Sequence, residues 1–350
     1  RRAMNGHDPE TVRKNGEVLM HKLGILTASL AAMLSFGGVT IEARAQAPAM
    51  KKITFLTNYV YNGRHAPFFV GRDKGFYKEA GFDIDIAPAT GSGFVIAAVD
   101  GGKADYGMAE VGPVVQAVAK GAKLKAFMVY TDVTTSGLAS LTPFRTPESI
   151  IGKRIAASQT DSARVVLPII FDEKKLDASK LDWQAADPGV YFSLLLSNRT
   201  DLFTASSDGD MPALTKVATA QGKSVEFSSF VDWGYDVFGY VLVAATPTLE
   251  KNLDEAKRFA AATRKAVEYA IKNPEETADI MVKANPAMNR ETVLTQWTGA
   301  IKSMQTPYTA EHGYGAAEDK RIQRTIDLVK KALKLDATLA PDDLFAIKGK

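Results

Sequence analysis

Apolar residues recur along most of the chain in patterns that switch between the period of a strand and that of a helix. Residues 52–57 (KITFLT) form a short apolar run rich in β-branched side chains, and residues 82–87 (FDIDIA) alternate with a period of two. Residues 66–78, which lie between them, follow a helical pattern that ends before Ala80-Gly81. This order of strand and helix predicts a mainly parallel sheet covered by helices.

The same alternation occurs twice, which predicts two lobes. The first series continues to residue 130, and the second runs from about residue 146 to residue 221. The further strands that we expect are residues 105–109, 125–130, 154–157, 181–185 and 201–205, and the further helices are residues 92–101, 113–120, 161–174, 190–196 and 210–221. A long strand-like run at residues 235–245 then predicts that the chain returns to the first lobe.

The last hundred residues are helical in pattern. Residues 253–272 repeat apolar side chains at helical spacing, and Asn273-Pro274 ends that helix and begins the next. Two more helices are expected, from Asn289 to Met304 and over residues 319–333. We expect this helical tail to pack on the first lobe, which then comprises residues 48–133 and 238–350. The second lobe comprises residues 134–237.

The N-terminal segment differs from the rest in charge and composition. Residues 23–41 are uncharged, basic residues precede them, and two Ala-x-Ala sites follow within residues 43–47. This is the pattern of a secretory signal, so we expect residues 1–47 to hold a signal peptide with some upstream residues, and the protein to be periplasmic. The alternative interpretation is an uncleaved membrane anchor, because the uncharged stretch is nearly long enough to span a bilayer.

Composition excludes several classes of function. The chain has 43 Lys and Arg, 40 Asp and Glu, and no Cys, so it cannot form disulfides or thiolate metal sites. Near-neutral charge without a basic run argues against nucleic acid as a partner. There is no GxSxG or GxxxxGK[ST] motif, and only His65 and His312 follow residue 47. We therefore expect no catalytic residues, no metal site and no cofactor.

Polar and aromatic side chains follow several of the expected strands. In open parallel sheets, ligands bind at the carboxyl ends of the strands, so these residues are candidates for a binding site. They are Asn58, Tyr59, Tyr61, His65 and Phe68 after the first strand, Gly91, Ser92 and Gly93 after the second, Glu110 after the third, Thr160, Ser162, Ser207 and Asp208 in the second series, and Trp233 and Tyr235 before the return strand. The aromatic members favour a flat ligand, because rings gain from stacking and edge contacts.

Some of these candidates also have a purely structural interpretation. Ser92, like Asp161, could simply cap a helix. Tyr61 and Phe68 could belong to the hydrophobic core, and Trp233 and Tyr235 could pack between the lobes. Glu110 follows an apolar strand and could accept hydrogen bonds from an amine or a ring N–H, or pair with a basic side chain.

Two segments carry a family resemblance. Residues 57–77 (TNYVYNGRHAPFFVGRDKGFY), followed by KEAGF, resemble the opening of the NMT1/THI5-like, or SsuA-type, solute-binding proteins of ABC importers. Residues 100–121 (DGGKADYGMAEVGPVVQAVAKG) resemble the strand and helix that come later in that family. The resemblance implies a two-lobed clamshell of the type II periplasmic-binding-protein fold. The ligand contacts that it implies are Asn58, Tyr59, His65, residues 91–93 and Glu110.

The resemblance also implies a function. Such a protein captures a small organic solute, here an aromatic or pyrimidine-like one of the thiamine-precursor type, and delivers it as a monomer to an ABC permease and its ATPase in the inner membrane. Tyr59 stands where pyrimidine-binding members often have Trp. Two alternatives remain: a thiamine-pyrimidine synthase-like enzyme, which in this family uses a Cys-rich motif absent here, and a ligand-sensing subunit of a receptor.

Overall fold

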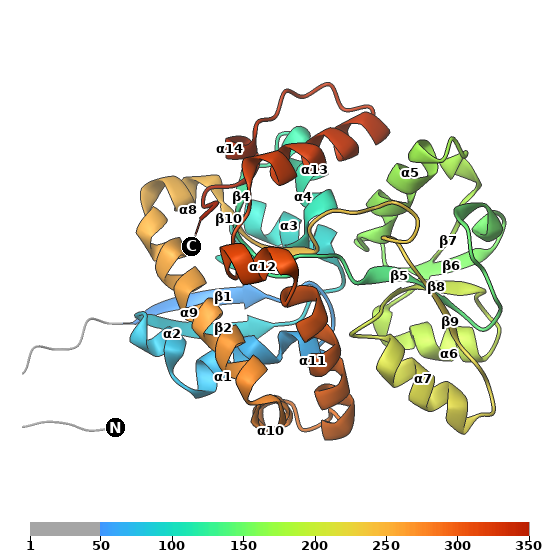
Figure 1. Ribbon diagram of the computed structural model, residues 1–350, viewed down its shortest axis with the longest axis horizontal. Helices are drawn as coiled ribbons and strands as arrows, with labels where there is room; N and C mark the ends of the chain where they lie inside the picture. The colour runs from blue at the N-terminus through green and yellow to red at the C-terminus, as the bar shows by residue number, and fades with distance from the viewer. Residues whose placement is uncertain (1–49, 350) are drawn as a thin grey trace, which may run out of the picture. The chain divides into compact units, whose positions relative to one another are not determined.

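The computed structural model describes residues 50–349, which fold around two five-stranded sheets (Figure 1). We call each sheet with the helices packed on it a lobe. The strands of the first lobe, in sheet order, are β2 (Phe82–Ala87), β1 (Lys51–Leu56), β3 (Tyr106–Glu110), β10 (Tyr240–Ala245) and β4 (Leu124–Val129). Those of the second are β7 (Asp182–Ala185), β6 (Arg154–Ala157), β8 (Leu202–Ser206), β5 (Ser136–Ser140) and β9 (Glu226–Ser229). The expected two-lobed α/β architecture is confirmed.

Each sheet is mixed rather than purely parallel. In the first lobe β1 pairs in parallel with β2 and β3, whereas β10 runs antiparallel to β3 and β4. In the second lobe β6 pairs in parallel with β7 and β8, whereas β5 runs antiparallel to β8 and β9. The chain enters β5 and β10 directly after crossing from the other lobe, through residues 130–135 and 230–239.

Both faces of the first sheet are covered by helices. One face packs on α1 (Ala66–Asp73), α2 (Phe76–Glu79), α9 (Leu253–Lys272), α10 (Pro274–Ala284) and α11 (Arg290–Met304). The other face packs on α3 (Ser92–Asp100), α4 (Val111–Ala119), α13 (Asp319–Ala332) and α14 (Pro341–Leu344). The ring of Phe259 lies at the centre of the first of these layers, 4.7 Å from Tyr106 and 5.0 Å from Tyr77 between centroids. Rows of alternating apolar residues in the strands thus reach both helical layers.

The second sheet packs on α5 (Ala163–Glu173) on one face and on α6 (Tyr191–Leu196) and α7 (Met211–Ala220) on the other. The helical tail does more than cover the first lobe, because α13 contacts both α4 and α5. Lys331 of α13 forms an ion pair with Glu173 at 2.7 Å. The remaining short helices are η1 (Gly63–His65), η2 (Pro147–Ile150), η3 (Ala178–Lys180), η4 (Pro188–Val190), α8 (Thr246–Lys251) and α12 (Pro307–His312).

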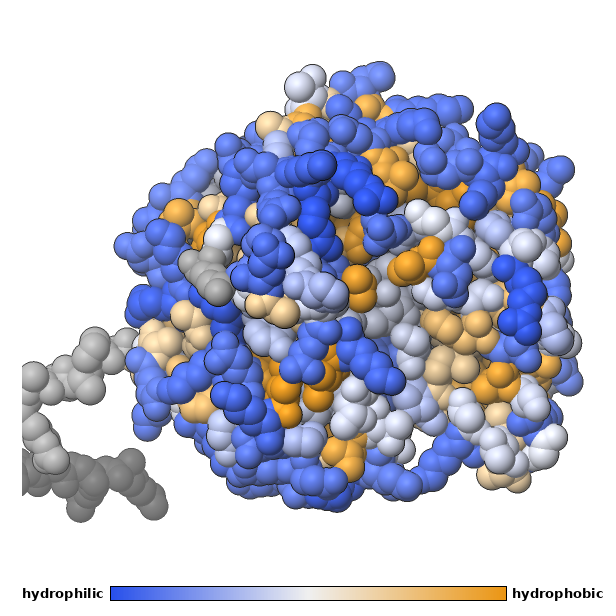
Figure 2. All heavy atoms as spheres, in the orientation of Figure 1, coloured by the Kyte–Doolittle hydropathy of each residue, from blue (hydrophilic) through white to orange (hydrophobic). Residues whose placement is uncertain are grey.

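The expected signal segment, residues 1–47, lies outside the described residues. Hydrophilic side chains cover most of the face that Figure 2 shows, and hydrophobic ones form separate patches. Among residues 50–349, none of the helices combines the length and the apolar character needed to cross a bilayer.

Candidate functional site

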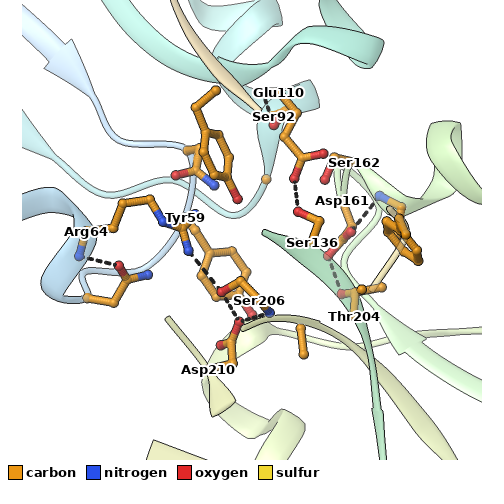
Figure 3. Close-up of a pocket in the computed structure, with 18 residues that line it drawn as sticks. Tyr59, Arg64, Ser92, Glu110, Ser136, Asp161, Ser162, Thr204, Ser206 and Asp210 are labelled. Carbon is orange, nitrogen blue, oxygen red and sulfur yellow. Dashed lines mark hydrogen bonds between the residues drawn. The ribbon is translucent and has the colours of Figure 1, made fainter. Parts of the chain in front are cut away.

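A small pocket lies where the carboxyl ends of the parallel strands of the two lobes meet (Figure 3). Its volume is about 40 Å³. The first lobe contributes Asn58, Tyr59, Asn62, Arg64, Gly91, Ser92, Glu110 and Tyr240, and the second contributes Ser136, Gly137, Asp161, Ser162, Ala163, Thr204, Ala205, Ser206 and Asp210, with Phe230 from the crossing segment. Such a volume holds only a few water molecules. Hydrogen bonds from Arg64 to Asp208 and from the Gly93 backbone N–H to the Thr160 carbonyl join the two lobes around it.

Glu110 connects the two lobes inside the pocket. It is the last residue of β3 and is only 4% exposed. Its backbone N–H donates to Ser92 Oγ at 3.0 Å, and its Oε1 accepts a hydrogen bond of 2.6 Å from Ser136 Oγ of β5. Burial raises the pKa of the Glu110 carboxyl above its ordinary value, because a charged carboxylate loses hydration there.

Two further carboxylates enter from the second lobe. Asp161 accepts from the Ala163 backbone N–H at 2.9 Å and from Thr204 Oγ1 at 2.6 Å. Asp210 accepts from the backbone N–H and the hydroxyl of Ser206, at 2.8 and 2.9 Å, through the same oxygen, Oδ2. Burial raises the pKa of both carboxyls, that of Asp210 to about 6. Figure 3 shows these acidic side chains facing the same space.

Arg64 is the basic side chain of the pocket wall. Its guanidinium donates to Asp208 through Nε and Nη2, at 2.8 Å each, and to Ser206 Oγ at 2.9 Å. The guanidinium also lies over the Tyr240 ring, 4.5 Å from its centroid. Asp208 therefore neutralises Arg64, and the three carboxylates of Glu110, Asp161 and Asp210 leave the pocket acidic.

The orientation of Asn58 is set by His65. The Asn62 backbone N–H donates to His65 Nδ1 at 3.2 Å, so His65 Nε2 carries the proton and donates to Asn58 Oδ1 at 3.0 Å. Burial lowers the pKa of His65, and the positive charge of Arg64 lowers it further, so the ring is neutral. The Asn58 amide group, Nδ2, is thereby left for the pocket.

Gly91 allows the two lobes to approach each other at the rim. It has a φ of +152°, and a Cβ there would overlap the carbonyl oxygen of Thr160 in the second lobe. The Gly93 backbone N–H donates to the same oxygen at 2.9 Å. A side chain at position 91 is thus opposed both by backbone conformation and by the neighbouring lobe.

The structure brings together part of the set of residues expected from the sequence. Those that line the pocket are Asn58, Tyr59, Gly91, Ser92, Glu110 and Ser162. His65 and Asp208 lie behind it, bonded to residues of its wall, and Gly93 and Thr160 meet at its rim.

The other expected residues lie elsewhere. Tyr61 donates to the Ile86 carbonyl at 2.7 Å, and Phe68 stacks on Tyr130 inside the core. The side chain of Ser207 is exposed. Trp233 and Tyr235 border a separate cavity beside α5 and α13, where Trp233 Nε1 donates to the Arg145 carbonyl at 3.1 Å.

Sequence reasoning missed several wall residues. Arg64 and Asp210 stand next to expected candidates, and a search for charged residues within two positions of them would have found both. Ser136 was missed because the sequence SGLAS of β5 has no strong strand pattern. Tyr240 was missed because the return strand begins there rather than at residue 235.

Among solved structures, the chain is similar to proteins with a two-lobed binding fold. A structure from Bordetella bronchiseptica RB50 matches with a TM-score of 0.67 and 17% identity, over 85% of this chain and 94% of that one. The alkanesulfonate-binding protein SsuA from Xanthomonas axonopodis pv. citri, bound to MOPS, matches with a TM-score of 0.64 and 14% identity, over 85% and 99%. These similarities define the fold as the type II periplasmic-binding-protein fold.

The family model described as NMT1/THI5 like matches residues 62–277, which is more than half of the chain. The chain therefore belongs to the NMT1/THI5-like family. A relative in sequence is the 4-amino-5-hydroxymethyl-2-methylpyrimidine phosphate synthase THI11 of Saccharomyces cerevisiae, 24% identical over 70% of this chain and 75% of the relative. Within residues 50–349, no group of three or more His, Asp or Glu side chains is arranged to hold a metal ion.

Proposed function

We propose that this protein is an extracytoplasmic solute-binding protein that captures one small organic solute between its lobes and delivers it to an ABC importer. The observation that carries this proposal is the shared wall of the pocket. Residues of both lobes face one small space at the carboxyl ends of the parallel strands, and Glu110 of the first lobe is hydrogen-bonded to Ser136 of the second. A wall built in this way is complete only when the lobes are together.

The mechanism that we propose is opening and closing of the lobes. Two segments, residues 130–135 and 230–239, connect the sheets, and rotation about them would separate the walls of the pocket. A solute larger than a few water molecules enters only when the lobes are apart. Closure then buries it and forms the surface that a permease, with its ATPase in the inner membrane, recognises.

The solute that we favour is aromatic or pyrimidine-like, of the thiamine-precursor type. The rings of Tyr59, Phe230 and Tyr240 offer flat apolar contacts, and the carboxylates accept hydrogen bonds from ring N–H or amino groups. The yeast relative is named as a synthase of a pyrimidine phosphate, which agrees with this class of molecule.

The same relatives favour a second candidate, a thiamine-pyrimidine synthase-like enzyme. The two functions differ in what happens to the bound molecule, because a binding protein returns it unchanged. A third candidate, a sensor subunit with the same closure, differs in its partner. A permease and an ATPase encoded beside this chain would favour transport over sensing.

The experiment that tests the proposal is a thermal-melting screen of the purified protein against pyrimidines, flavins, aromatic acids and sulfonates. We expect a reversible, concentration-dependent rise in Tm with one class of solute and no product by mass spectrometry. Export can be tested by cell fractionation, and the monomeric state by light scattering. Conversion of the solute would favour the enzyme instead, and the absence of any response would contradict solute binding.

A further inference from the structure

The charges around the pocket do not balance. Four carboxylates lie in its wall or directly behind it, and they belong to Glu110, Asp161, Asp208 and Asp210. Asp208 is paired with Arg64 by two hydrogen bonds, and within residues 50–349 the other three have no ion pair with a basic side chain. Their hydrogen-bond partners are hydroxyl and backbone N–H groups, which carry no charge.

Arg64 attracts Glu110 and Asp210, and Arg164 attracts Asp161, but neither forms an ion pair with them. The guanidinium of Arg164 is turned to the carbonyl oxygens of Ser158 and Ala157, at 2.6 and 3.0 Å. His65 is neutral and its Nε2 proton is used by Asn58. When the three carboxyls are ionised, the pocket thus holds more negative charge than its own side chains compensate.

The carboxylates also have unused acceptor capacity. An ionised carboxylate accepts about four hydrogen bonds. The Ser136 and Ser162 hydroxyls are the hydrogen-bonding groups at the Glu110 carboxyl, which leaves part of its acceptor capacity unused, and both bonds to Asp210 reach Oδ2, which leaves Oδ1 for another donor. The two residues enter from different lobes, so a donor placed between them would be held from both sides.

A separate observation points to a ligand at this place. The Asn58 side chain is 6% exposed and lines the pocket, and within the described residues its Nδ2 makes no hydrogen bond. Because His65 fixes the other end of the amide, Nδ2 faces the pocket and is free to donate to an acceptor of a bound molecule.

We propose that the solute is a cation: a small ring or chain with a protonated amine or amidinium group that binds between Glu110 and the second-lobe carboxylates, and with a carbonyl or ring-nitrogen acceptor that faces Asn58. This inference rests on the proposed solute-binding function and names the charge of the solute. Buried carboxylates without a counter-charge disfavour an anion, which would add negative charge in a region of low dielectric. Sulfonates and carboxylates are therefore disfavoured as solutes, although the fold is shared with a protein named as alkanesulfonate-binding.

The test uses molecules that match in shape and differ in charge. Benzamidine, benzamide and benzoate, with the corresponding pyrimidine derivatives, are titrated calorimetrically into the purified protein at pH 7.5, together with every solute found by the melting screen. We expect the cation of each set to bind at least tenfold more tightly than its neutral analogue, and the anion not to bind. Tighter binding of an anion or a neutral analogue would overturn the inference and leave solute binding intact. If no compound of the panel binds, the result would contradict both the cation inference and the proposed solute binding.

A variant separates charge from shape. Glu110→Gln keeps an oxygen to accept from Ser136 and removes the negative charge, so we expect cation affinity to fall tenfold or more and the affinity for the neutral analogue to change by less than threefold. Glu255→Gln is the matched control, because Glu255 is also buried but pairs with Lys51 and Tyr106 far from the pocket. Equal losses for the cation and the neutral analogue in Glu110→Gln would show that Glu110 acts through packing and would overturn the proposal.

Discussion

The Arg64 guanidinium and the Asp208 carboxylate join the two lobes through a pair of parallel hydrogen bonds, each 2.8 Å long. Both side chains are only 2% exposed. Arg64 belongs to η1 beside the first sheet, and Asp208 follows β8 of the second. Gln296 of α11 strengthens the same contact, because it accepts from the Gly63 backbone N–H at 2.9 Å and donates to the Gly209 carbonyl.

We expect removal of the charge of Asp208 to be strongly destabilising. In Asp208→Asn the buried Arg64 cation loses its counter-charge, and breaking such a pair lowers the free energy of unfolding by about 3–5 kcal/mol. The matched control is Asp201→Asn, since Asp201 makes a similar bidentate pair with the partly exposed Arg154. That change should cost about 1 kcal/mol or less. Urea unfolding of both variants is the measurement, and equal losses would show that the Arg64 pair is no more important than a surface pair.

A methyl group at position 91 should obstruct closure. In Gly91→Ala the new Cβ overlaps the Thr160 carbonyl oxygen, so the lobes cannot reach the arrangement described here. We expect solute affinity to fall tenfold or more. Gly102→Ala is the control, because Gly102 also has a positive φ but no atom within 4 Å of the added Cβ. Both changes introduce backbone strain, so similar affinities in a binding assay would count against the steric argument.

Ionisation of Asp210 should make the unliganded protein less stable at neutral pH than in mild acid. Its pKa is about 6 in the folded protein against an ordinary value of 3.8, so between these values the folded state binds more protons than the unfolded state. The contribution of Asp210 to stability therefore falls as pH rises from about 4 to 6. Arg64, Asp208 and Tyr59 are the charged or titratable groups near it.

The test compares the wild type with Asp210→Asn, which cannot ionise. The Tm of the variant minus that of the wild type should increase by a few degrees between pH 4 and pH 7. The corresponding change in the free energy of unfolding is on the order of 1 kcal/mol, because the Asp210 side chain is partly exposed. Other carboxyls titrate in both proteins and cancel in the difference. A difference that stays constant or decreases would show that Asp210 is not held in a desolvated position.

Two pocket side chains should control the response to solute without controlling the fold. Tyr59→Ala and Glu110→Ala each remove a group that faces the pocket, so the ligand-induced rise in Tm should disappear while the Tm of the free protein changes little. Tyr61→Phe is a suitable control, since the Tyr61 hydroxyl donates to the Ile86 carbonyl rather than to the pocket. A normal response in both alanine variants would place the binding site elsewhere.

The sequence predicted the lobes and the order of elements well, because apolar periodicity records which faces of strands and helices are buried. Asn289, for example, was expected to begin a helix, and its side chain accepts from the Thr292 backbone N–H at 3.0 Å. Strands β5 and β9 were not predicted, since SGLAS and EFSS are short and only weakly apolar. Their place in the sheet depends on pairing with β8 and with each other.

The pocket was harder to predict than the fold. The rule that ligands bind at strand ends selected Asn58, Tyr59 and Glu110, which the structure places in the wall of the pocket. It could not show that Arg64 is neutralised by Asp208, because these residues are 144 positions apart and meet only in the folded protein, across the two lobes. The acidic character of the pocket is therefore a property of the folded structure and not of any one segment.

The most direct test of the central claim is equilibrium dialysis of the purified protein against the solute selected by the melting screen, with mass spectrometry of the solute recovered after dissociation. We predict one bound molecule per chain and an unchanged mass for every recovered molecule. Recovery of a chemically altered molecule, or binding that survives unchanged in Gly91→Ala and Glu110→Ala, would contradict reversible capture between the lobes.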